Sequence, residues 1–282
     1  MSNSPWSHSR SGAVSDDVDF EIKGQELQFV EIELDPGESA VAEAGAMVWK
    51  DAAIDMTTVF GDGSDNQGSG FMGKLLGAGK RLVTGESLFT TVFTHQGHGK
   101  ARVAFAAPIP GSIVPIKLDS VGGRLICQKD AFLCAARGVS IGIHFQQKIL
   151  TGLFGGEGFI MQRLDGDGWV FVQMGGTVIE RDLAPGEELH IDTGCVAAFT
   201  AGIDFDVTRA GSVKSMIFGG EGVFFARLRG PGKVWIQSLP FSRLAGRMMA
   251  AAMPYGGQNR GESTLLGLGA LGGIGAIISG DD

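Results

Sequence analysis

The sequence predicts an all-β protein made of three tandem copies of one unit of about 64 residues, followed by a short C-terminal helix. Residues 154–173 match residues 218–237 at 11 of 20 positions, always at an offset of 64, which chance does not produce. Within each copy, Pro-Gly or Gly-Gly turns lead into alternating apolar and polar residues, the pattern of half-buried strands. The 46 glycines fit tight turns between short strands better than long helices.

The first expected element is a flexible, serine-rich tail over residues 1–17. It lacks the apolar stretch of a signal peptide, so we expect a cytoplasmic protein, with a peripheral position at the inner face of the membrane as a further option. Cys127, Cys134 and Cys195 lie among apolar residues without a Cys-x-x-Cys pair. They are expected to be buried thiols.

The first copy is expected over residues 18–110. Its turn at Pro36-Gly37-Glu38 follows an alternating segment, 26–34, and recurs with identical internal spacing at Pro185-Gly186-Glu187. This copy is longer than the others by about 14 residues, and these extra residues lie within an insertion region at about 61–84. The second half of the insertion is basic and amphipathic, with leucines on one helical face and cations opposite. Its candidate contact residues are Phe71, Lys74, Leu75, Leu76, Lys80 and Arg81.

The second and third copies are expected over residues 111–178 and 179–240. In each copy a turn near the end joins two strands, and its composition predicts a hairpin. These turns are 95–100, 165–168 and 229–232.

The C-terminal region, 241–282, begins with a predicted helix over 241–253. Phe241, Leu244 and Met248 lie on one side of this helix, and Arg243 and Arg247 lie on another. The apolar segment 264–279 is too short and too rich in glycine to predict a membrane span, and is expected to pack on the body or on a partner.

Four features carry a family resemblance: Gly45-Ala46-Met47-Val48, residues 82–89, the repeated Phe-Gly-Gly-Glu-Gly, and the arginine-bearing helix. Together they resemble the "altered inheritance of mitochondria" family, a domain of unknown function that is widespread in bacteria. The resemblance covers roughly residues 18–253. It implies three units with the fold of the tryptophan RNA-binding attenuation protein, a small β-sandwich resembling a shortened double-stranded β-helix, and a homotrimeric ring.

Elementary physics favours the same assembly. A unit of this size buries a marginal core and exposes two strand edges, so pairing with the next copy supplies burial and protects the edges. The first and third copies each keep one open edge. Head-to-tail association around a threefold axis closes such edges. A self-closed monomer is the alternative.

The repeated carboxylates Glu86, Glu157 and Glu221 are the strongest candidate ligand or interface residues. Three glutamates at equivalent positions could line an axis or groove and bind a cation or a basic partner. Alternatively, they accept backbone N–H bonds at turns or pair with Arg163 and Arg227, which follow by six residues in the second and third copies. The first copy has Val92 in place of the arginine.

Catalytic machinery is not visible in the sequence. A cupin-type metal site needs His-x-His followed closely by Glu, whereas the five histidines are scattered. Neither a Ser-His-Asp nor a Cys-His arrangement has a recognisable local context. We expect no catalytic residue, no metal and no cofactor.

The formal charge of −8 disfavours attraction to nucleic acids. RNA binding by analogy with the attenuation protein would rest on fold alone, because the repeats lack a matching set of lysines and arginines. RNA and DNA are therefore unlikely partners.

The basic insertion and the helix bearing Arg243 and Arg247 differ from the repeat, and there we expect function. A cationic amphipathic segment suits an anionic membrane surface; the alternative is that both segments only cap the β body. The preferred hypothesis is a non-enzymatic, ring-forming structural protein that docks to a membrane surface or a protein partner. The alternative is a small-molecule or metal-binding module with sites between repeats.

Overall fold

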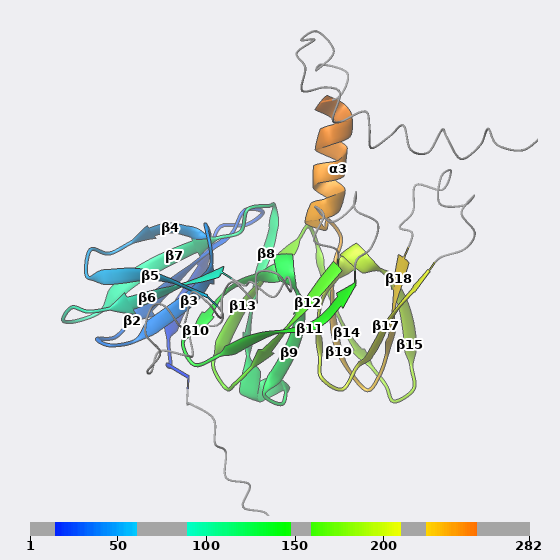
Figure 1. Cartoon of the computed structure of the whole chain (residues 1–282), viewed down its shortest axis with the longest axis horizontal. Coiled ribbons are helices and arrows are strands. Elements are labelled where there is room, and N and C mark those ends of the chain that lie inside the picture. Colours follow the sequence, from blue (N-terminus) through cyan, green and yellow to red (C-terminus); the bar gives the residue numbers. More distant parts are fainter. Residues whose placement is uncertain (1–14, 61–88, 148–158, 210–223, 253–282) are drawn as a thin grey trace, which may run out of the picture. The chain divides into compact units, whose positions relative to one another are not determined.

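The structure is a computed structural model that describes residues 15–60, 89–147, 159–209 and 224–252 (Figure 1). Most of the described chain is β-strand, and one α-helix follows the last strand. The all-β prediction and the predicted C-terminal helix are both confirmed.

Each copy contributes six strands in the same order along the chain. The first copy holds β2 (Phe29–Leu34), β3 (Ser39–Glu43), β4 (Met47–Lys50), β5 (Ile54–Phe60), β6 (Phe89–His95) and β7 (Ala101–Ala106). The second holds β8 (Gly111–Lys117), β9 (Arg124–Gln128), β10 (Phe132–Ala136), β11 (Ser140–Gln147), β12 (Phe159–Asp165) and β13 (Trp169–Gly175). The third holds β14 (Val178–Leu183), β15 (Glu188–Asp192), β16 (Val196–Thr200), β17 (Asp204–Arg209), β18 (Phe224–Arg229) and β19 (Gly232–Gln237).

Within a copy, the six strands divide into two antiparallel triplets. The first, sixth and third strands pair in that order, and the second, fifth and fourth pair likewise; in the first copy these are β2-β7-β4 and β3-β6-β5. The second and third copies repeat both orders. Each copy is therefore a small sandwich of two triplets.

Neighbouring copies are joined by strand pairing. The second strand of one copy pairs antiparallel with the third strand of the next, as β3 with β10 and β9 with β16. Four sheets result: a first sheet β1-β2-β7-β4, a second sheet β5-β6-β3-β10-β13-β8, a third sheet β11-β12-β9-β16-β19-β14, and a fourth sheet β15-β18-β17. The middle two sheets each contain strands of two copies, so the copies do not form independent domains.

The turns predicted to close hairpins join strands of different sheets, so that prediction is wrong. The turn after β6 leads to β7, but β6 pairs with β3 and β5 while β7 pairs with β2 and β4. The corresponding turns of the other copies, between β12 and β13 and between β18 and β19, do the same. Turn residues fix a chain reversal, whereas the strand partner is set by the apolar faces that two sheets bury against each other.

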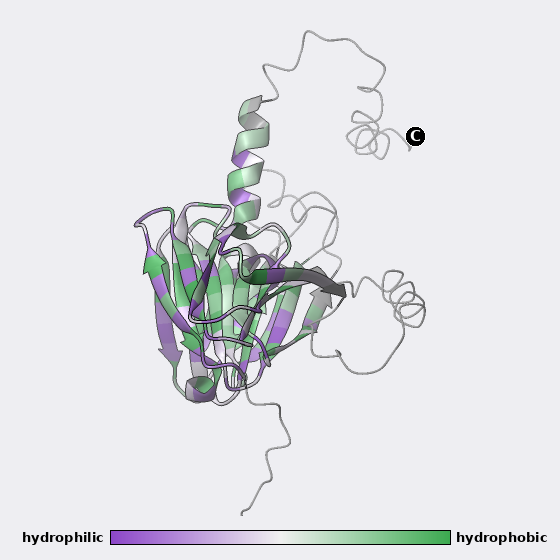
Figure 2. Cartoon of the chain, turned by 90° about the vertical axis from the view of Figure 1, so that its left-hand side faces the viewer, coloured by the Kyte–Doolittle hydropathy of each residue, from purple (hydrophilic) through white to green (hydrophobic). Residues whose placement is uncertain are grey.

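Three core clusters fill the spaces between successive sheets. Phe105 of the first sheet and Phe93 of the second are buried in one cluster, with ring centroids 5.0 Å apart. Leu164 and Val172 belong to the cluster between the second and third sheets, and Phe199 belongs to the last. Along the strands, hydrophobic and hydrophilic residues alternate in many places (Figure 2). The inner strand β10 of the second sheet contributes to core clusters on both of its faces, so it is buried throughout.

The extra strand β1 (Asp19–Lys23) precedes the first copy and pairs with β2. Its Phe20 ring lies edge-on to Trp169 and Phe171 of the second copy, with both centroid distances 4.9 Å. Residues 15–17, the described part of the predicted tail, are also bonded to the body. Ser15 N donates to Asp167 at 2.9 Å.

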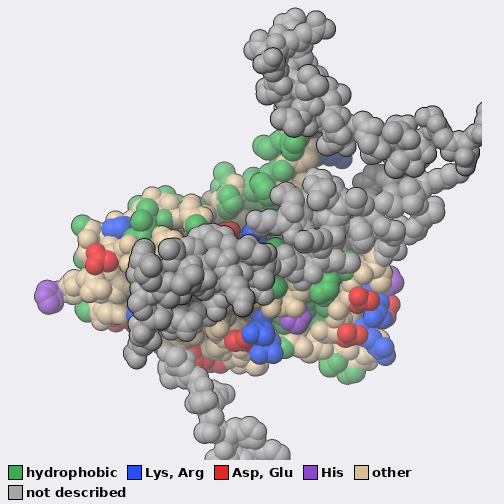
Figure 3. Space-filling view, in the orientation of Figure 1, with side chains coloured by type: hydrophobic (Ala, Val, Ile, Leu, Met, Phe, Trp, Pro, Cys, Tyr) green, Lys and Arg blue, Asp and Glu red, His purple; other side chains and the backbone are tan. Residues whose placement is uncertain are grey.

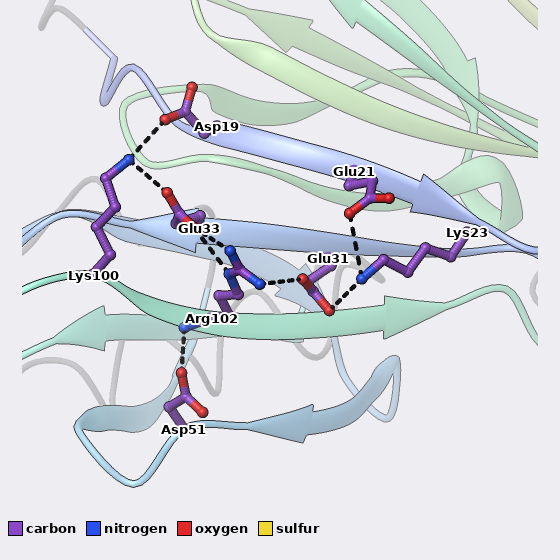
Figure 4. A network of polar contacts seen from close by, with 8 residues as sticks. All are labelled: Asp19, Glu21, Lys23, Glu31, Glu33, Asp51, Lys100 and Arg102. Atoms are coloured by element: carbon purple, nitrogen blue, oxygen red, sulfur yellow. Dashed lines mark hydrogen bonds and ion pairs between the residues drawn. The ribbon is translucent and has the colours of Figure 1, made fainter.

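A network of charged side chains links β1, β2 and β7 across the first sheet (Figure 4). Glu31 accepts from Lys23 at 3.0 Å and from Arg102 at 3.2 Å, and Glu33 lies 2.7 Å from the same guanidinium. The hydrogen bond from Lys100 lowers the pKa of Glu33, and Arg102 adds to that effect. Exposed cross-strand pairs of this kind stabilise a fold only weakly but favour the register in which they form. The network therefore helps to fix β1 in register on β2.

The helix α3 (Phe241–Ala252) follows β19 in the chain, and from Arg243 onward it belongs to a unit separate from the β body. At 3.6 residues per turn, Phe241, Leu244 and Met248 fall on one side, and Arg243 and Arg247 on the other. This arrangement agrees with the sequence prediction.

Candidate functional site

The repeated glutamates Glu86, Glu157 and Glu221 lie outside the described residues, so their predicted role stays a prediction. The candidate contact residues of the insertion lie outside them as well: Phe71, Lys74, Leu75, Leu76, Lys80 and Arg81.

Arg163 and Arg227 occupy equivalent central positions, on β12 and β18. Arg163 Nε lies 2.6 Å from Asp165, and Arg227 lies 3.8 Å from Glu188 and 3.7 Å from Asp206. Both arginines thus have carboxylate neighbours among the described residues. In the first copy, the position of these arginines on β6 is occupied by Val92, which pairs with β3. The first copy therefore lacks the arginine charge.

Acidic and basic side chains gather over the strands of the third copy (Figure 3). On β15, β18 and β17, His190 pairs in register with Arg227, and Arg227 with Asp206. Opposite charges that face each other across adjacent strands favour this register, and they keep a free strand edge soluble. The face is a balanced set of ion pairs, which differs from a field of one sign that would attract a charged macromolecule.

The strand β4 is an open, apolar edge of the first sheet. Met47, Val48 and Trp49 are 37%, 55% and 36% exposed. Their counterparts in the third copy, which begin at Val196, are essentially buried, because β16 is paired on both sides. The first copy thus exposes a strand that the repeat otherwise covers.

The strand β15 is the matching open edge of the fourth sheet. Its counterparts β3 and β9 each pair with the third strand of the next copy, whereas the one described strand that pairs with β15 is β18. Ile191 is buried in the third core cluster, and His190 is exposed with its Nε2 2.8 Å from Glu188. Among the described strands, β4 and β15 are therefore the two open edges whose counterparts in the other copies are paired, and they differ in chemistry.

Polar side chains occupy equivalent positions where the copies join. Between the second and third copies, Gln237 donates to Gln128 at 3.1 Å and to the Gly194 carbonyl at 3.0 Å, and accepts from Gly175 N at 2.9 Å. Both the oxygen and the nitrogen of the buried Gln237 amide therefore have hydrogen-bond partners. This network fixes the junction without a charge.

Glu43 stands in the first copy where Gln128 stands in the second. Burial raises the pKa of the Glu43 carboxyl to about 7; the Asp130 carboxylate adds to this rise and the Lys129 ammonium opposes it. A carboxyl that is neutral near neutral pH can replace the amide at this position. Sequence reasoning missed Glu43, because Asp130 is distant in the sequence and comes close only through the pairing of β3 with β10.

The variant Glu43→Gln is expected to change how stability depends on pH. Because the folded protein holds the Glu43 proton more tightly than the unfolded chain, the wild type loses stability as pH rises from about 4.5 to about 7. Glutamine removes this loss and should gain up to about 3 kcal/mol relative to wild type at pH 8, compared with pH 4.5. Urea unfolding at several pH values measures it. Glu26→Gln, at an exposed carboxyl, is the control, and parallel pH curves for wild type and Glu43→Gln would contradict the expectation.

Among the described residues, no group of three or more His, Cys, Asp or Glu side chains is placed to hold a metal ion. Within the same part of the chain, no helix is long and apolar enough to cross a membrane. Cys127 and Cys134 are free and buried, and burial raises the pKa of the Cys127 thiol to about 12.

The fold and these edges define a class: tandem β-sandwich proteins whose units join edge to edge within one chain. The chain belongs to the family described as Mitochondrial biogenesis AIM24, whose sequence model matches residues 20–239. The family resemblance drawn from the sequence is confirmed.

Two relatives come from Streptococcus pyogenes. An uncharacterized protein of serotype M6 is 32% identical over 229 residues, which cover 80% of this chain and 87% of the relative. An X-ray crystal structure of an S. pyogenes protein superposes with a TM-score of 0.66 at 26% identity, and covers 83% of this chain and 99% of that one. The solved structure shows that the all-β fold is shared.

Proposed function

We propose that this protein is a non-enzymatic scaffold that assembles head to tail into a homotrimeric ring and docks on a membrane surface or a protein partner. The observation that carries the proposal is the pair of open edges on β4 and β15, in an array whose other equivalent edges are paired. Three consecutive exposed apolar residues, Met47 to Trp49, are costly in a free strand and useful in an interface.

A non-enzymatic role is supported by how the charged groups of the body are used. Arg163 and Arg227 have carboxylate neighbours on their own sheets, and the network around Glu33 fixes adjacent strands. These groups stabilise strand registers, which is what a scaffold needs.

Docking through α3 is supported by its exposed apolar side chains. Phe241, Met248 and Met249 are 50%, 64% and 63% exposed, and Arg243 and Arg247 occupy the other side. A helix with this division lies in a membrane interface with its apolar side down and its cations near lipid phosphates. Three helices on one ring would act together, so a weak individual contact becomes a firm one.

Co-sedimentation of the full chain with vesicles tests the docking. We expect binding to phosphatidylserine-containing vesicles at low salt and weaker binding at high salt. Arg243→Glu with Arg247→Glu should reduce bound protein at least about tenfold, because each basic residue contributes about 1 kcal/mol near an anionic surface. The matched control is Arg243→Lys with Arg247→Lys, which keeps the charge.

Two results would count against membrane docking. One is a lack of binding by the intact chain whose mass in solution shows a trimer, which leaves the ring with a protein partner. The other is unchanged binding after both the charge reversal and removal of residues 71–83. A monomeric mass at micromolar concentration would instead remove the ring and its avidity.

A further inference from the structure

The two junctions inside the chain use one register. Ala42 of β3 stands opposite Cys134 of β10, and Cys127 of β9 stands opposite Ala198 of β16. Cys127 and Cys134 lie 64 residues before Ile191 and Ala198 in the sequence. The pairings are therefore the same contact, repeated one copy further along.

The paired third strands also share an irregularity. In β10 the register against β13 shifts between Phe132 and Cys134, and β16 shifts against β19 at its own equivalent place. The open strand β4 shifts against β7 between Met47 and Trp49. A register shift at the same place in all three strands indicates that β4 has the local irregularity that its counterparts carry where they pair with the preceding copy.

Repeating the register once more identifies the partners at the open edges. Ile191 of β15 corresponds to Ala42 and Cys127, and Trp49 of β4 corresponds to Cys134 and Ala198. The four residues already paired are fully buried, whereas Trp49 is 36% exposed.

We infer that β15 of one chain pairs antiparallel with β4 of a second copy, with Ile191 opposite Trp49, His190 opposite Lys50 and Leu189 opposite Asp51. This inference rests on the proposed ring and specifies its interface. Ile191 belongs to the third core cluster and Leu189 packs against it. The Trp49 indole would extend that cluster into the neighbouring chain.

The residue pair that lies next to Ile191 and Trp49 along the two strands distinguishes this interface from the internal ones. Inside the chain the pair is Val41 with Ala135, all apolar and buried. Between chains it would be His190 with Lys50, and His190 already contacts Glu188. Edges that must stay soluble before assembly need such polar residues, whereas edges joined within one chain do not.

Cysteine cross-linking of co-expressed, full-length chains tests the register. One chain carries Trp49→Cys and the other Ile191→Cys, both with Cys195→Ser, and each bears a different tag. Mild oxidation should give a covalent two-chain species that is absent when either variant is expressed alone. His190→Cys with Lys50→Cys is a second in-register pair, in case loss of Trp49 weakens assembly.

Out-of-register pairs and an internal pair are the controls. Lys50→Cys with Ile191→Cys should cross-link at least about ten times less, because adjacent residues of a strand point to opposite faces. Ala198→Cys should form a disulfide with Cys127 inside one chain, which calibrates the geometry of the shared position.

The possible outcomes distinguish a failure of the inferred β15–β4 register from a failure of the proposed ring. A trimeric mass with neither in-register pair cross-linked would overturn this inference and leave the ring intact through another surface. A monomeric mass for the wild type would overturn both. Cross-linking within a single chain carrying Trp49→Cys and Ile191→Cys, without cross-linking between singly substituted chains, would show a self-closed monomer and also overturn it.

Discussion

Replacement of Phe171 by alanine is expected to lower the free energy of unfolding by about 3–5 kcal/mol, the usual cost of removing a buried phenylalanine ring. Phe171 is fully buried in the second sheet, pairs in register with Cys134, and touches the ring of Phe20 edge-on. The alanine would leave a cavity between two sheets. The sheets cannot close this cavity without breaking the hydrogen-bond ladders between their strands. The shift of the urea unfolding midpoint measures the loss.

The same variant should destabilise the first copy as well as its own. Phe171 belongs to the second copy but lies in the core cluster of the first, beside Phe105 and Ile32. Hydrogen exchange should therefore accelerate in β2 and β7 as well as in β13. The control is Met56→Ala, at a side chain that is 53% exposed, which should cost less than about 0.5 kcal/mol. Faster exchange confined to the second copy would contradict cooperative copies.

The sequence contains much of this fold because the repeat and its turns are local signals. The match at an offset of 64 identifies the copies, and Pro36-Gly37-Glu38 marks a turn wherever it recurs. Strand partners are not local. The turn after His95 reverses the chain as predicted but sends β7 into another sheet, since alternation along a strand does not say which sheet covers it.

For the open edges, too, local sequence patterns predict one part of the result, and contacts between distant residues decide the other part. That the first and third copies each keep an edge follows from tandem order alone. Which strands these are follows only from the pairing of β3 with β10 and β9 with β16. A signal for β4 does exist in the sequence: Met47-Val48-Trp49 keeps large apolar residues in a strand that pairs with β7 on one side and is open on the other among the described strands. Glu43 carries no such signal, because its pKa depends on neighbours from the second copy.

Replacement of Trp49 by aspartate is expected to convert the proposed ring into single chains. The substitution removes an aromatic side chain and places a carboxylate opposite Ile191, where the third core cluster would otherwise be extended. Truncating a central aromatic residue of an interface costs about 2 kcal/mol or more, and burying an unpaired charge adds to that. Association should weaken at least about 100-fold. Light scattering over a concentration series measures the change in mass.

The control must carry the same chemical change at an edge that the array leaves unpaired. Met56→Asp meets this need, because Met56 is exposed on β5, an outer strand of the second sheet. Both variants add one negative charge and remove one exposed apolar side chain, so solubility and net charge change alike. If both variants dissociate, general charge repulsion is responsible. If neither does, β4 is not the interface. Dissociation of Trp49→Asp alone locates assembly at β4, a strand whose counterparts β10 and β16 are already paired inside the chain.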